Sequence, residues 1–169
     1  MKTNRPACAA LLLLPLLLAA CTPRGGSSQE VARDLDNYTN ELRKWEPKEQ
    51  AIFQAIDDVE ESQYLDDDFV VRTLKGALPE LDQHIVEVAA YRPATAELVD
   101  LHQHYRKGWE DLRTALDAMI AAQSKKDYPA LSKGKARMMA ARNLLLKAVS
   151  AMDGLMEEND EAVKNLRKS

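Results

Sequence analysis

Residues 98–122, LVDLHQHYRKGWEDLRTALDAMIAA, carry the pattern that decides the fold. Apolar or small residues recur along this stretch at alternating intervals of three and four, the spacing of a helix that packs against other helices. Trp109, Leu116 and Ile120 widen the apolar side of that helix. The residues at this spacing are Leu98, Leu101, Tyr105, Gly108, Leu112, Ala115, Met119 and Ala122.

The same spacing recurs in three other segments, 31–59, 71–88 and 131–155. Pro47 lies within the first segment, but the register continues across it, so we expect one kinked helix there. Acidic residues favour the starts of helices, and proline suits the first turn of a helix. The positions of these residues predict where each helix begins. The expected helices begin near residues 29, 66, 93 and 127 and end near residues 62, 92, 124 and 166.

Four long amphipathic helices with short connections predict an all-α protein, an antiparallel up-down-up-down four-helix bundle over residues 29–169. The first and last helices are the longest, at ~34 and ~40 residues against ~26 and ~31 for the other two. In this topology the start of the first helix and the end of the last lie together. We therefore expect both to overhang their neighbours by ~12–13 Å as a two-helix neck.

The run Leu18-Ala19-Ala20-Cys21 follows a basic start and an apolar stretch of residues 9–18, which is too short to span a bilayer. This run resembles the lipobox of bacterial lipoproteins. The resemblance implies that residues 1–20 are a signal peptide, removed between Ala20 and Cys21. It also implies that Cys21 receives a diacylglyceryl group and an amide-linked acyl chain, which anchor the protein stably to a membrane. The alternative is an ordinary secreted protein with a chance cysteine.

Residues 21–28 would then be the lipidated cysteine and a flexible tether, with a reach of at most ~23–25 Å over its last seven residues. Thr22 stands where an aspartate typically signals inner-membrane retention, so we expect the outer membrane as the location. Cys8 lies in the segment to be removed, which leaves Cys21 as the only thiol.

The expected mature chain is acidic. Removal of residues 1–20 takes away two basic residues and no acidic one, so the excess of acidic residues increases. It keeps 21 basic and 27 acidic residues, a formal net charge of −6. This balance argues against nucleic acid as a partner, since nucleic-acid binding needs a basic face. The membrane, reached through Cys21, and an envelope protein or the cell wall are the expected partners.

Motifs for metal, haem or catalysis are missing from the sequence. Di-iron bundles use Glu-x-x-His, but Leu81, Val99 and Leu101 stand three residues before the three histidines. The CxxCH motif of c-type haem is absent, and no Ser or Thr lies in a recognisable constellation with a base and an acid. We therefore expect no metal, no cofactor and no enzyme activity. The alternative is a carrier or sensor that holds a small hydrophobic ligand or haem inside the bundle, with His84 or His102 and Met138 or Met152 as ligands.

Two groups of residues are candidates for binding a partner. Tyr105 and Trp109 share a helical face and are either core residues or an exposed aromatic patch, since Trp and Tyr dominate interface hot spots. The second group is a basic stretch without acids, which either pairs with acidic residues 57–68 or binds a charged partner. It contains Lys133, Lys135, Arg137, Arg142 and Lys147. The sequence thus predicts a lipid-anchored, non-enzymatic interaction or assembly module of the cell envelope.

Overall fold

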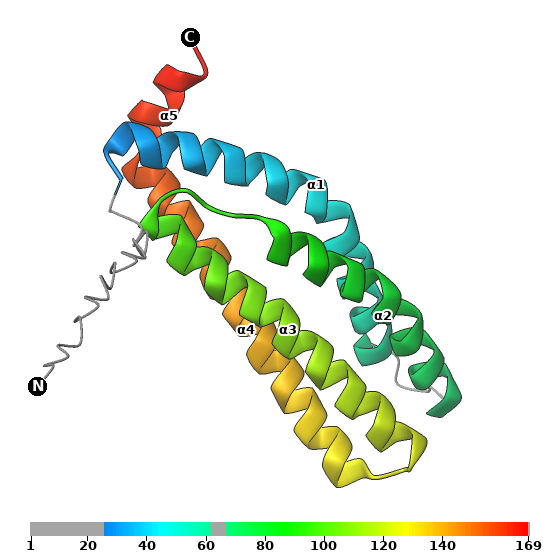
Figure 1. The fold of residues 1–169 in the computed structure, drawn as a ribbon. Coiled ribbons are helices and arrows are strands. Elements are labelled where there is room, and N and C mark those ends of the chain that lie inside the picture. Colours follow the sequence, from blue (N-terminus) through cyan, green and yellow to red (C-terminus); the bar gives the residue numbers. More distant parts are fainter. Residues whose placement is uncertain (1–25, 62–66, 169) are drawn as a thin grey trace, which may run out of the picture.

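The computed structural model describes residues 26–61 and 67–168, and it is all-α, as the sequence predicts (Figure 1). The helices are α1 (Ser28–Glu61), α2 (Asp67–Ala90), α3 (Ala96–Ser124), α4 (Tyr128–Glu158) and α5 (Asp160–Leu166).

The first four helices run alternately up and down (Figure 1). α3 packs most extensively on α4, α2 packs on α3, and α1 packs on α2, whereas α1 and α4 meet over a short distance only. Pro47 lies inside α1, which continues through it as one helix. The apolar positions at the three-and-four spacing form one core, with Leu35, Ile52, Leu74, Leu98, Leu112 and Met138 among its fully buried members.

Two glycines bring α3 and α4 close together. A Cβ atom on Gly108 would lie 2.6 Å from Leu145 Cδ2, and one on Gly134 would lie 2.7 Å from Met119 Cγ. Both distances are well inside van der Waals contact, so a larger residue at either position requires the Leu145 or Met119 side chain to move.

The third helix begins at Ala96, three residues later than the expected Pro93. Its N-cap residue, Thr95, makes no side-chain cap hydrogen bond. Instead, Asp34 Oδ2 on α1 accepts hydrogen bonds from Ala94 N (2.8 Å), Thr95 N (2.7 Å) and Thr95 Oγ1 (2.8 Å). The start of α3 is therefore held by a carboxylate from α1. The residues next to Thr95 in the sequence gave no sign of this contact.

The expected single helix 127–166 is interrupted at Asn159, and a separate short helix, α5, follows it. Asn159 Nδ2 donates to the Leu155 carbonyl at 2.9 Å, and Ser28 Oγ of α1 donates to Asn159 Oδ1 at 3.2 Å. The amide side chain thus ends α4 and ties this break to the start of α1.

The prediction of a two-helix neck is wrong. The start of α1 is covered by Ala94 and Thr95 through Asp34, and Glu97 of α3 lines the same groove as Glu158 at the end of α4. α5 turns to pack against α1, where Val163 is buried and Arg167 lies 2.9 Å from Asp36. The overhang expected from the helix lengths does not form, because residues of the extended segment 91–95 cover the start of α1 and because α4 ends at the break at Asn159.

Candidate functional site

Tyr105 and Trp109 do not form a surface patch. Tyr105 is 3% exposed and Trp109 is 1% exposed, because both lie on the side of α3 that faces α1 and α2. Of the two alternatives, the exposed aromatic patch is therefore wrong, and core packing accounts for both side chains.

These two residues belong to a buried cluster of aromatic rings that also encloses the His84 side chain. His84 lies edge-on to Trp109, with ring centroids 4.4 Å apart, and to Trp45, at 6.0 Å. Its Nε2 atom is 3.3 Å from Glu49 Oε1, and the Tyr105 hydroxyl donates a hydrogen bond to the same carboxylate oxygen. Glu49 thus brings polar groups of three helices together inside the core.

A second polar contact joins α1 to α3 nearby, where the Tyr38 hydroxyl lies 3.1 Å from His102 Nδ1. Burial lowers the pKa of His102, so this ring remains neutral to lower pH than an exposed histidine. Burial also raises the pKa values of the tyrosines in the cluster, that of Tyr91 to about 12. The phenols therefore remain protonated hydrogen-bond donors.

The residues expected as haem ligands lie on three helices, with His84 on α2, His102 on α3, and Met138 and Met152 on α4. α2, which carries His84, and α4, which carries Met138, are not in contact. The space between α1, α3 and α4 beside Met152 measures about 10 Å³. A space of that size holds at most one water molecule. Within the described residues, no group of three or more His, Cys, Asp or Glu side chains could hold a metal ion.

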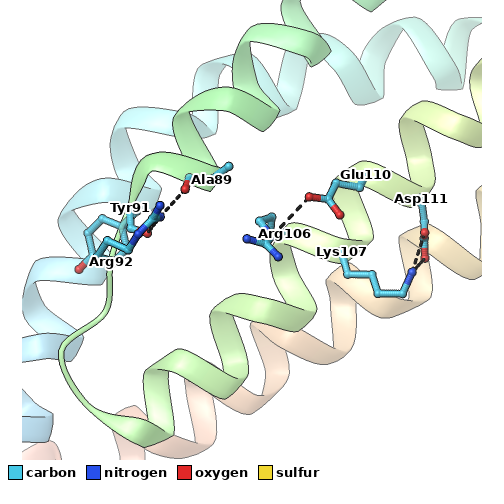
Figure 2. Close-up of polar contacts among 7 residues, drawn as sticks. All are labelled: Ala89, Tyr91, Arg92, Arg106, Lys107, Glu110 and Asp111. Atoms are coloured by element: carbon cyan, nitrogen blue, oxygen red, sulfur yellow. Dashed lines mark hydrogen bonds and ion pairs between the residues drawn. The ribbon is translucent and has the colours of Figure 1, made fainter. Parts of the chain in front are cut away.

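Charged residues on the outer side of α3 pair within the helix (Figure 2). Lys107 Nζ lies 2.8 Å from Asp111 Oδ1, and Arg106 Nε lies 3.4 Å from Glu110 Oε1. Arg92 donates hydrogen bonds to the carbonyls of Ala89 and Tyr91, at the end of α2. These charges stabilise helices and helix ends.

The basic candidates on α4 divide into two classes. Arg142 Nη1 lies 2.9 Å from Asp57 Oδ1 and 3.2 Å from Glu60 Oε2 of α1. Its guanidinium also lies 5.2 Å from the centroid of the Phe53 ring, a cation–π contact. Arg142 is therefore an internal link between α4 and α1, and its assignment to partner binding is corrected. Three others are exposed and make no hydrogen bond or ion pair with the described residues, namely Lys133, Lys135 and Arg137.

The structure adds three residues that the sequence analysis did not select, Met139, Leu146 and Val149. Their side chains are 46%, 65% and 41% exposed, and they lie on α4 in line with Lys135. Their positions, with Arg142 between them, follow the three-and-four spacing beside the buried face of α4. A second apolar register next to the first was the signal that could have found them. We call Lys135, Met139, Leu146 and Val149 the α4 stripe.

The α4 stripe is the candidate functional site. Five large apolar side chains are strongly exposed in the described part of the chain, and three of them lie in this stripe; the others are Val86 on α2 and Tyr128 at the start of α4. Single exposed apolar residues need no explanation, but a line of them beside an unpaired cation indicates a contact surface. Lys133 and Arg137 lie on the opposite flank of the helix, and Arg137 lines a groove with Asp111 and Ala140.

Cys21 and the whole run Leu18–Cys21 lie outside the described residues. No helix in 26–61 or 67–168 is long and apolar enough to cross a membrane. Comparisons with protein-family models, with curated proteins and with solved structures give no match to this chain.

Proposed function

We propose that the protein is a lipid-anchored interaction module of the bacterial cell envelope, non-enzymatic, and held at the outer membrane by acylated Cys21. The anchor rests on the run Leu18–Cys21 and the apolar stretch before it. The bundle then serves to display a surface to another envelope protein near the membrane.

The α4 stripe is the observation that carries this proposal. Its three apolar side chains are exposed to water, and burial of such area against a partner stabilises a complex by about 25 cal/mol per Å². Lys135 adds a cation without a partner in the described chain. A partner that buries this stripe is therefore expected to present apolar side chains with an acidic group beside them.

Site-specific photo-crosslinking in cells tests the docking surface. A photoreactive residue at Leu146 should trap a defined protein adduct, whereas the same residue at Val86, which is 68% exposed on α2, should not. Lys135→Glu should lower the yield of the Leu146 adduct because it places like charges together. Equal adducts from both positions, or an increased yield with Lys135→Glu, would contradict the proposal.

A further inference from the structure

A groove lies between α3 and α4, at the end of the bundle where α3 begins and α4 ends (Figure 1). It measures about 560 Å³, within the range of small-molecule sites. Apolar side chains of both helices line it, namely Leu101, Leu144, Ala148, Ala151 and Leu155, and His104 lines it as well.

Carboxylates gather at one end of this groove. Glu97, Asp100 and Glu158 line it, and their side chains make no hydrogen bond or ion pair with the described residues. Glu97 Oε2 is buried and has no hydrogen-bond partner. A carboxylate oxygen removed from water without a partner is costly, and a donor from a bound molecule would satisfy it.

Gly154 lines the same groove, and no neighbour among the described residues requires a glycine there. A Cβ atom built on it would meet nothing within 4 Å, in contrast to Gly108 and Gly134. Glycine inside a helix costs about 0.5–1 kcal/mol relative to alanine. Its presence in the wall of a groove permits close approach of another molecule to the helix backbone.

We propose that this groove binds an amphiphilic amine, with an apolar chain along the floor and an ammonium group among Glu97, Asp100 and Glu158. The rise of α4 from Lys147 to Glu158 gives the groove a length of ~16 Å, enough for an extended chain. Three free carboxylates select a cationic head, and Lys147 at the other end disfavours a second cation. This site is separate from the α4 stripe, so it does not depend on the proposed docking function.

Calorimetric titration with three ten-carbon probes tests the site, with decylammonium and decyl sulfate each below its micellar concentration and decanol below its solubility limit. The protein is the full chain carrying Cys21→Ser, so that no attached lipid competes. Decylammonium should bind about tenfold or more tightly than either other probe, since one charge-assisted hydrogen bond in a half-buried site corresponds to about that factor. Equal binding of the three probes, or none by decylammonium, would overturn the proposal.

Two variants locate the binding. Gly154→Leu should abolish decylammonium binding by filling the groove, and Glu97→Gln, which preserves shape, should weaken it about tenfold. Gly76→Leu is the matched control, because a Cβ there also meets nothing within 4 Å but lies on α2, away from the groove. Circular dichroism checks that each variant is folded. Unchanged affinity in folded Gly154→Leu, or equal losses in Gly154→Leu and Gly76→Leu, would refute the location.

Discussion

Glycines in this bundle have different roles that depend on their neighbours. Gly108 faces Leu145 across the contact between α3 and α4, where Leu145 N would also lie 3.4 Å from an added Cβ. Gly76 faces open space on α2. The sequence places Gly108 at the three-and-four spacing, where a glycine permits close approach of helices, and the structure identifies Leu145 of α4 as the residue it faces.

Substitution of these glycines should therefore change stability in opposite directions. Gly108→Ala should destabilise the fold by about 1–3 kcal/mol, because the Leu145 side chain must move to accept the methyl group. Gly76→Ala should stabilise it by about 0.5–1 kcal/mol through helix propensity alone. Urea unfolding of each variant measures both effects. Stabilisation by Gly108→Ala would show that α3 and α4 are further apart than described.

For the aromatic residues of α3, helical spacing alone does not decide between burial in the core and exposure at an interface. Periodicity places Tyr105 on the buried side of a helix and Trp109 at its edge, and both can pack in a core or in an interface. The neighbours that decide between these outcomes come from other helices, with Trp45 and Glu49 on α1 and His84 on α2. Spacing along one helix does not contain that information.

At the scale of elements, the start of α3 depends on Asp34 of α1. This carboxylate is 5% exposed and accepts hydrogen bonds from two backbone amides and one hydroxyl. It replaces the local side-chain cap that Thr95 does not provide. The segment 91–95 is thereby held against α1 and not left as a free turn.

Removal of this contact should be costly. Asp34→Ala leaves several buried donors without an acceptor, and we expect a loss of about 2–4 kcal/mol in the free energy of unfolding. Asp36→Ala is the control, since it removes an exposed ion pair with Arg167 and should cost at most about 1 kcal/mol. Amide hydrogen exchange at Ala94 and Thr95 should accelerate in the first variant only. Equal effects of the two substitutions would contradict the role given to Asp34.

The elements themselves were largely predictable. Pro47 did not break α1, because the apolar register on both sides of it continues to bury one face. The break at Asn159 was not predicted, because the register of Ala162 and Leu166 continues that of α4 in sequence. The side-chain amide of Asn159 and its bond to Ser28 decide that break, and Ser28 is distant in the chain.

At the scale of the whole molecule, the proposed anchor and the folded domain are linked through the start of α1. Cys21→Ser in the full chain should prevent acylation and release the protein from the membrane fraction, since no helix of the described residues could span a bilayer. Fractionation of cells followed by immunodetection measures this change. Cys8→Ser is the matched control and should leave membrane association unaltered. Persistence of Cys21→Ser in the membrane fraction would contradict the lipid anchor.

The candidate surfaces also emerge at this scale, and α4 carries most of them. The basic residues were visible as a stretch without acids, but the pairing of Arg142 with Asp57 and Glu60 required the position of α1. The exposure of Met139, Leu146 and Val149 follows from the short contact between α1 and α4, which leaves this side of α4 uncovered.

The sequence by itself determined the all-α class and the four main helices, because the three-and-four spacing of apolar residues is a property of the sequence alone. It also determined the absence of a Glu-x-x-His or CxxCH motif. The tertiary structure decided where α3 begins, where α4 ends, which cations are paired and where the groove between α3 and α4 lies. Each of these depends on atoms from helices that are distant in sequence, and their relative placement is set by the packing of the whole bundle.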